Sequence, residues 1–230
     1  MEKIKRVSML LLTSSISFLI VLTLISSNLA YAVPTTLGLP TTFPTNNRPQ
    51  QLITSDVNND GNYDIVTSAS PYISVLLGNG NGTFGNPILS LWHPPQFGES
   101  SGGLVATRLN QDAYPDIVVA DSTGGTLYIV IGNGDGTFGD GSGNNAQAYG
   151  GGFTARALKS ADFNKDGFGD TVNIGTAFGD SNLVINYGTG NGTLVSGTQF
   201  GKPQFNLNFS STAVGDLNND SWLDFIAGNK

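Results

Sequence analysis

Four short windows contain most of the acidic side chains of this 230-residue chain. They read DVNNDGNYD from Asp56, RLNQDAYPD from Arg108, DFNKDGFGD from Asp162 and DLNNDSWLD from Asp216. Eleven of the 17 acidic residues lie in these windows, and all eleven are Asp. Short carboxylates concentrated in turn-like segments are typical of loops that ligate a cation, whereas helix surfaces favour Glu.

The first window has oxygen-bearing side chains at positions 1, 3, 5 and 9, namely Asp56, Asn58, Asp60 and Asp64. Together with the carbonyl of Asn62, these oxygens can surround one hard cation such as Ca²⁺, and Gly61 permits the sharp turn. An EF-hand is excluded because position 12 is Thr67 rather than Glu and no helix pattern follows. The alternative is a solvated polar turn. Carboxylates at positions 1, 5 and 9 in three windows favour the cation, because their mutual repulsion would otherwise destabilise the loop.

The windows recur at spacings of 52, 54 and 54 residues, which indicates a repeat protein. A second motif follows the first three windows in constant order: LLGNGNGTF, VIGNGDGTF and INYGTGNGTL. Between the turns lie short segments rich in Val, Ile and Tyr, such as DIVTSAS and TLYIVIG. The sequence therefore predicts an all-β fold of about 3.5 repeats, each an antiparallel four-stranded propeller blade with its fourth strand running on from GTF.

These motifs resemble the FG-GAP and VCBS-type repeats of integrin-α-like β-propellers over about residues 50–228. The resemblance implies Ca²⁺ as the cofactor and a role in adhesion or ligand binding. It implies three metal sites: the first loop as above, a third-window set and a fourth-window set. The third comprises Asp162, Asn164, Asp166, Phe168 (carbonyl) and Asp170, and the fourth Asp216, Asn218, Asp220, Trp222 (carbonyl) and Asp224.

The second window departs from the family pattern. Arg108 occupies position 1 and Ala113 the glycine position, which leaves Asn110, Asp112 and Asp116 as weak candidate ligands. A guanidinium beside two carboxylates can neutralise them without a metal.

Residues 1–32 are predicted to be a secretory signal peptide, with a basic start, an apolar run and Ala30-Tyr31-Ala32 as the cleavage site. We therefore expect a secreted, extracellular protein with no membrane span after cleavage. Residues 33–49 would form a linker or a closing strand. The blades are expected at about residues 50–101, 102–151, 152–206 and 207–230, the last one truncated. A longer parent protein, an outer strand from residues 33–47, or self-association through the open blade edge could complete the ring.

The composition excludes several functions. A formal net charge of −7 without a basic patch argues against nucleic acid. Cys is absent, His93 is the single histidine, and no nucleophile motif is present, so we expect no enzymatic activity. The predicted partner is an extracellular protein or carbohydrate, with Trp92, His93, Phe97 and Tyr149 on inter-blade links as candidate contacts. The alternatives are a propeller of a polysaccharide-degrading enzyme, or a fragment with no independent function.

Overall fold

Fourteen β-strands make up the regular structure of the chain in the computed structural model, which describes residues 42–45, 48–92, 100–123, 125–140, 147–150, 154–177, 180–200 and 209–229. No helix within these ranges is long and apolar enough to cross a membrane. Residues 43–230 form one unit, to which the description below refers.

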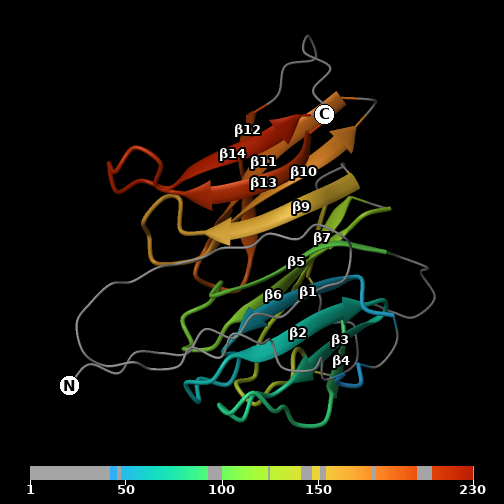
Figure 1. Cartoon of the computed structure of the whole chain (residues 1–230). Helices are drawn as coiled ribbons and strands as arrows, with labels where there is room; N and C mark the ends of the chain where they lie inside the picture. Colours follow the sequence, from blue (N-terminus) through green and yellow to red (C-terminus); the bar gives the residue numbers. More distant parts are fainter. Residues whose placement is uncertain are drawn as a thin grey trace, which may run out of the picture. The chain divides into compact units, whose positions relative to one another are not determined.

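The strands form three four-stranded antiparallel sheets and one two-stranded sheet, each in chain order (Figure 1). The first sheet contains β1 (Gln51–Ser55), β2 (Asp64–Ala69), β3 (Tyr72–Leu76) and β4 (Ile88–Leu91). The second contains β5 (Ser101–Thr107), β6 (Asp116–Asp121), β7 (Thr126–Val130) and β8 (Gln147–Gly150). The third contains β9 (Thr154–Ala161), β10 (Asp170–Ala177), β11 (Asp180–Gly188) and β12 (Leu194–Phe200). β13 (Phe209–Gly215) and β14 (Asp224–Asn229) form the last.

The second strand of each complete sheet begins at position 9 of an Asp window and lies in the middle of its sheet. Every residue of β2 and β6 is buried, which explains why their apolar residues, Ile65-Val66 in β2 and Ile117 to Ala120 in β6, are consecutive rather than alternating. Each Asp window is therefore the hairpin connection between the first and second strands. The predicted all-β fold and its four-stranded antiparallel blades are confirmed.

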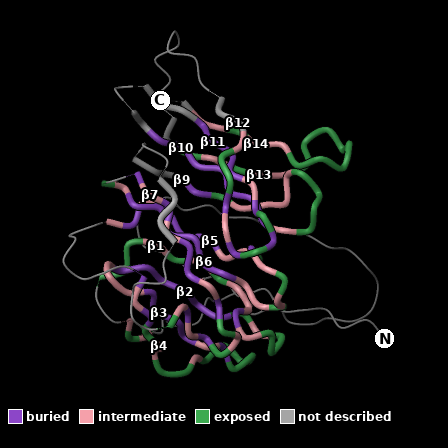
Figure 2. Tube along the Cα trace, turned by 180° about the vertical axis from the view of Figure 1, so that it is seen from behind, coloured by how far each residue is buried: buried purple, intermediate pink, exposed green. Residues whose placement is uncertain are grey.

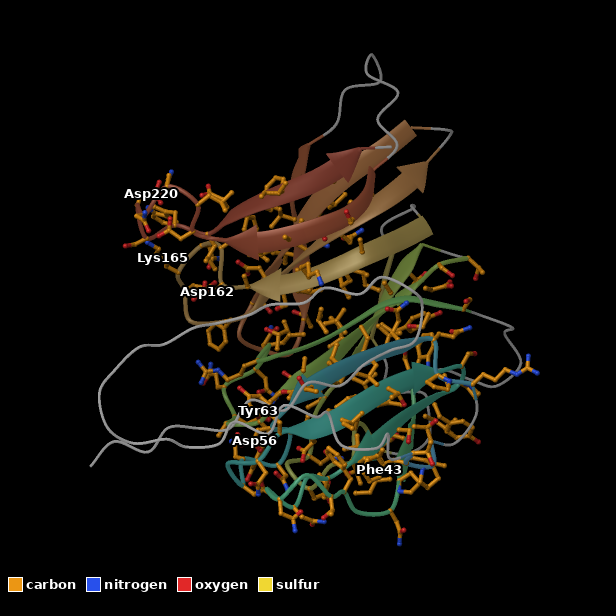
Figure 3. All side chains as sticks on the ribbon, viewed as in Figure 1. Phe43, Asp56, Tyr63, Asp162, Lys165 and Asp220 are labelled. Carbon is orange, nitrogen blue, oxygen red and sulfur yellow. The ribbon has the colours of Figure 1, made fainter. Side chains whose placement is uncertain are left out.

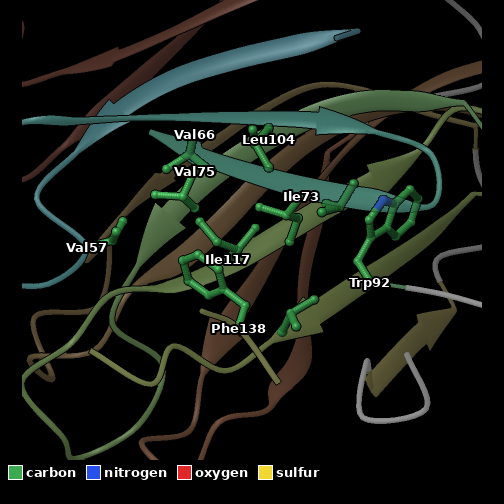
Figure 4. Packing of buried hydrophobic residues seen from close by; sticks show 10 residues of the cluster. Val57, Val66, Ile73, Val75, Trp92, Leu104, Ile117 and Phe138 are labelled. Atoms are coloured by element: carbon green, nitrogen blue, oxygen red, sulfur yellow. The ribbon is translucent and has the colours of Figure 1, made fainter. Parts of the chain in front are cut away.

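Consecutive sheets pack face to face, and their first strands lie side by side: β5 contacts β1 and β9, and β9 contacts β13. One apolar cluster joins the first two sheets, where Val57 and Val66 meet Ile117 and Phe138 (Figure 4). Further clusters join the second sheet to the third and the third to the fourth. Burial is greatest in the central strands, and the Asp loops lie mostly at the exposed ends of the sheets (Figure 2).

The fourth strand begins directly at the Gly-Thr turn in the third repeat, where β12 starts at Leu194, but not in the first two repeats. Phe84 and Phe138 form isolated bridges with Gly78 and Gly132, so β4 and β8 do not run on directly from GTF. Phe138 is instead fixed between the sheets, because its side chain is buried and its N–H donates to Ser90 Oγ at 2.9 Å. Tyr149, which the sequence placed on an inter-blade link, lies instead in β8. Within the described residues the sheets form no closed ring, as expected for an incomplete propeller.

Candidate metal loops

The first Asp window, between β1 and β2, is closed by its own side chains. Asp56 accepts hydrogen bonds from the N–H groups of Asp60 (3.1 Å) and Gly61 (2.9 Å) through its two carboxylate oxygens. Asn58 Oδ1 also accepts from the N–H of Asp60, at 3.2 Å. Asp60 in turn accepts from the N–H of Asn62 at 2.8 Å. Because positions 1 and 3 share one N–H group, their oxygens lie close together.

The third and fourth windows repeat this arrangement. Asp162 accepts from the N–H groups of positions 5 and 6 at 3.1 and 2.9 Å, and Asp216 does so at 3.2 and 2.8 Å. Position 6 has positive φ in all three loops, with φ of 87° at Gly61, 91° at Gly167 and 68° at Ser221. Ser221 therefore adopts a conformation that favours glycine, yet the fourth loop still closes.

The Asp at position 9 connects the two sequence motifs. Asp64 accepts from the N–H of Val57 and from the N–H of Gly78, both at 2.8 Å, so one carboxylate joins the loop to the first glycine of the GNG turn. Asp116 and Asp170 make the equivalent pairs of bonds in the second and third repeats. Position 9 is thus a buried structural acceptor, whatever its role toward a metal.

The charges within a loop affect one another. Burial is the main cause that raises the pKa of Asp64, while hydrogen bonds from Gly78 and Val57 oppose the rise; the nearby carboxylates of Asp60 and Asp56 raise the pKa further. Hydrogen bonds from the backbone of Asn62 and the side chain of Asn58 lower the pKa of Asp60. The three acids of the first loop are therefore close enough to repel, which a bound cation would relieve.

The donor set fits a hard cation in its chemistry. Carboxylate, amide and carbonyl oxygens are the ligands that Ca²⁺ prefers. In the described part of the chain, however, no three Asp, Glu or His side chains are already assembled as a metal-binding cluster. The hydrogen bonds of position 9 explain this in part, because its two oxygens are engaged by the backbone. A cation would be held by Asp56, Asn58 and Asp60 with the Asn62 carbonyl, and by Asp64 through its remaining lone pairs.

The second loop keeps only part of this pattern. Asp112 accepts from the N–H of Tyr114 at 2.9 Å, and Asn110 accepts from the N–H of Asp112 at 3.0 Å. Arg108 does not cover these carboxylates as the sequence suggested. Its guanidinium donates to the carbonyl of Gly167 in the third loop at 2.8 Å and lies 5.9 Å from the centre of the Phe168 ring. The reason is the stacking of the sheets, which brings the third loop within reach of position 1 of the second.

Neighbouring loops are connected along the whole row. Asn59 of the first loop donates to the carbonyl of Ala113 in the second at 2.7 Å. Lys165 of the third loop lies over the Trp222 ring of the fourth, with its Nζ 3.8 Å from the ring centre. Figure 3 shows Lys165 and Asp220 close together at this end of the row. Lys165 also contributes to the lowered pKa of Asp220, after the hydrogen bonds from Trp222 and Asn218.

The glycines of the second motif are explained by contacts with the Asp loop. A Cβ on Gly78, Gly132 or Gly188 would collide with the carbonyl of the residue at position 8 of the preceding window. A Cβ on Gly134 would collide with the ring of Tyr114, which is position 7. Turn chemistry alone would assign these glycines to positive φ, but Gly78, Gly132 and Gly188 do not have positive φ and are required by this close packing. The constant order of the two motifs in the first three repeats was the signal for it.

Of the four residues predicted to contact a ligand, Trp92 is the one whose side chain the structure describes. Trp92 is 0 % exposed and packs edge-on against Tyr128 at 5.0 Å between ring centres, so it cannot serve as an exposed platform for a sugar ring. The stacked sheets bury it in the first core cluster. His93 and Phe97 lie outside the described residues, and Tyr149 lies in β8, of which the backbone alone is described. The exposed aromatic residues are instead on the loops: Tyr63 is 74 % exposed and Trp222 is 49 % exposed.

A repeated four-stranded blade with an Asp loop after its first strand defines the class of this protein. A family model described as an FG-GAP-like repeat matches residues 108–173 and 162–227, which together span more than half of the chain. The chain therefore belongs to the FG-GAP-like repeat family, as the sequence motifs indicated. The first window lies before the matched residues but forms the same hydrogen bonds.

Other comparisons add little. No curated protein matches the chain. Among solved structures, the chain is similar to one described as an Agrocybe aegerita lectin with specific recognition of non-reducing terminal N-acetylglucosamine, at 20% identity and a TM-score of 0.48. That similarity covers 78% of this chain and 46% of the other, so this chain spans less than half of its length.

Proposed function

We propose that this protein is an exported, calcium-stabilised β-propeller module that binds ligands without catalysing a reaction. The observation that carries the calcium proposal is the threefold recurrence of one loop geometry, in which Asp at position 1 and Asn at position 3 converge on the N–H of Asp at position 5. A solvated turn needs one such acceptor, and the additional carboxylates only add repulsion. Calcium would remove that repulsion and hold the row of loops.

The absence of catalysis is supported by the state of the acids. Carboxyl pairs whose pKa values are pushed apart, such as Asp60 and Asp64, are a feature of acid–base sites. Asp64, however, is fully buried, and both of its oxygens accept from backbone N–H groups, so it has no exposed face for a substrate. A polysaccharide-degrading enzyme was the alternative, and its proposed sugar platform, Trp92, is buried.

Export and an extracellular partner rest on the sequence of residues 1–32 and on the absence of Cys, which leaves metal rather than disulfides to fasten the loops. Adhesion to a protein or a carbohydrate is the role that agrees with a rigid repeat scaffold. N-terminal sequencing of the exported protein tests this part: a mature chain that begins at Val33 supports it, and a protein retained in the cytoplasm with Met1 intact contradicts it.

Calorimetric titration of Ca²⁺ into the chelator-treated protein tests the calcium proposal. We expect about three bound ions, from the first, third and fourth loops. Each site should stabilise the fold by about 2.7 kcal/mol when free calcium is 100 times its Kd. Asp162→Asn should remove one ion, because it removes a charged ligand from the third loop.

Asp135→Asn is the matched control. It removes the same charge from the GNG turn, where the equivalent residues are Asn81 and Asn191. Asn81 already accepts from the N–H and hydroxyl of Thr83 as Asp135 does from Thr137, so calcium binding should be unchanged. A folded protein that binds no calcium, or equal losses in the two variants, would contradict the proposal.

A further inference from the structure

A small cavity that is open to solvent lies where the first strands of three sheets meet. Its volume is about 240 Å³. It is lined by Ile53, Thr54 and Ser55 of β1, Val105 and Ala106 of β5, and Lys159 and Ser160 of β9. These residues immediately precede the Asp loops, so the cavity is formed at one level of the stacked sheets. Its walls come from rigid strands rather than from loops, which suits a binding site.

Lys159 is charged at a repeat position where the other three repeats have an apolar residue. The residues at the same distance before the other three windows are Ile53, Val105 and Ala213, all of them apolar. Lys159 is the one charged residue in the lining, and no carboxylate faces it there. No hydrogen bond or ion pair joins its ammonium group to any other residue in the described ranges. The Lys159 side chain is exposed, so its ammonium group is accessible to a ligand of opposite charge that enters the cavity from solvent.

Ser160 adds a second polar group without a partner. Its hydroxyl oxygen is buried and makes no hydrogen bond within the described part of the chain. A buried hydroxyl without a partner is unfavourable, and it could donate its proton to a ligand oxygen. The hydroxyl-bearing residues Thr54 and Ser55 belong to the same lining. The cavity therefore combines one cation with several hydroxyl groups over the apolar residues Ile53 and Val105.

A β-bulge places these two residues. The pairing of β9 with β10 shifts between Val172, opposite Lys159, and Ile174, opposite Arg156. Ala157 has a φ of 51°, a left-handed conformation that is uncommon for a residue other than glycine. Its carbonyl accepts from Thr212 Oγ1 of β13 at 3.0 Å, which holds the bulge from the next sheet. Bulges redirect the side chains that follow them, and here those are Lys159 and Ser160.

We propose that this cavity binds the carboxylate of a sugar acid, with Lys159 pairing with the carboxylate and Ser160 and Thr54 hydrogen-bonding to the sugar. The volume is below the range of about 300–1,000 Å³ for drug-sized pockets, which limits the occupant to about one sugar residue. The net charge of −7 opposes anions at long range, so the local pair with Lys159 must carry the affinity. The inference rests on the proposed ligand-binding function and names its ligand class.

The test is a titration of the calcium-loaded protein with galacturonate, galactose and acetate, followed by NMR. Galacturonate should bind, and galactose and acetate should each bind at least about tenfold more weakly, because each lacks one half of the recognised group. Lys159→Gln should weaken galacturonate at least about tenfold and Ser160→Ala about threefold, as expected for a charged and a neutral hydrogen bond. Arg48→Gln, which removes the same charge at an exposed site outside the lining, should change nothing.

The proposal would be overturned if galactose or acetate bound as tightly as galacturonate. It would also be overturned if the Lys159 and Arg48 variants lost the same affinity. Trigalacturonate distinguishes two sources of the same chemistry: tighter binding than the monomer assigns the site to an acidic polysaccharide, and equal binding assigns it to a free sugar acid. Calcium stoichiometry measured on the same sample separates the two proposals. If the protein binds three calcium ions but no galacturonate, only the proposal for the cavity is rejected. If it binds no calcium, the proposed calcium-binding function is rejected.

Discussion

At the scale of the residue, the Asp at position 9 explains why two turn motifs travel together. Asp116 accepts from the N–H of Leu109 at 2.8 Å and from the N–H of Gly132 at 3.0 Å. The equivalent residues of the other complete repeats, Asp64 and Asp170, accept the same pair of hydrogen bonds from the backbone. The acid must be preserved even in the second loop, where Arg108 replaces the first ligand. A metal is therefore not needed to account for position 9.

The first glycine of the GNG turn is the partner in that contact and should tolerate no side chain. Gly132→Ala would drive a Cβ into the carbonyl of Pro115, and we expect it to destabilise the protein by about 1–3 kcal/mol through overpacking. Gly85→Ala is the control, since its Cβ would meet one backbone oxygen at 3.7 Å and its φ is not positive. Urea unfolding measures both. Equal stability of the two variants would show that the contact is not tight.

At the scale of the element, the loops of the hairpins contain some acids with a raised pKa and others with a lowered pKa, and this fixes a pH dependence. Burial is the main cause that raises the pKa values of Asp64, Asp116 and Asp170 above 3.8. Such a group binds its proton more tightly in the folded state, so stability decreases as the pH rises from about 3.8 through the folded pKa. Hydrogen bonds lower the pKa values of Asp60, Asp135 and Asp220, and stability decreases as the pH falls below 3.8.

The metal-free protein should therefore be most stable in weakly acidic solution, somewhat above the ordinary Asp pKa, and less stable at pH 7. Saturating calcium binds the ionised carboxylates and should remove the decrease toward pH 7. Denaturant unfolding from pH 3 to pH 7, with chelator and with calcium, measures both curves. A free energy of unfolding that rises steadily up to pH 7 in chelator would contradict the raised pKa values of the buried Asp residues.

At the scale of the whole molecule, one repeat position has opposite environments in different sheets. Leu109 and Leu217 both stand at position 2 of a window, and the N–H of each donates to the Asp at position 9. Leu109 is 0 % exposed in the cluster between the second and third sheets, whereas Leu217 is 60 % exposed. The difference comes from the neighbouring sheet, which covers the second repeat, whereas the corresponding face of the last repeat stays open to solvent.

Leu109→Ala should therefore cost about 2–5 kcal/mol, while Leu217→Ala should change stability by no more than about 0.5 kcal/mol. The substitutions are chemically identical and occupy the same repeat position, so each controls for the other. Thermal or denaturant unfolding measures the two values. Similar losses would mean that Leu217 is covered in solution, for example by self-association, which dilution would then reverse.

The sequence by itself determined the repeat, the all-β class, the central strands and the placement of the Asp loops between the first two strands of each blade. Local patterns sufficed there because strand periodicity and turn chemistry depend on near neighbours in the chain. β6 and β10, for example, have the bounds that DIVVAD and DTVNIGTA predicted. The family followed from the same motifs.

The tertiary structure alone decided which residues are buried between sheets and which are exposed. Trp92 reads as a loop residue in the chain but enters a core whose members range from Leu104, 12 positions away, to Phe138, 46 positions away. Arg108 reaches the third loop, and Lys159 joins a cavity whose other walls come from β1 and β5. Contacts between blades set these positions, and a repeat pattern predicts that blades stack without fixing which side chains meet across the stack.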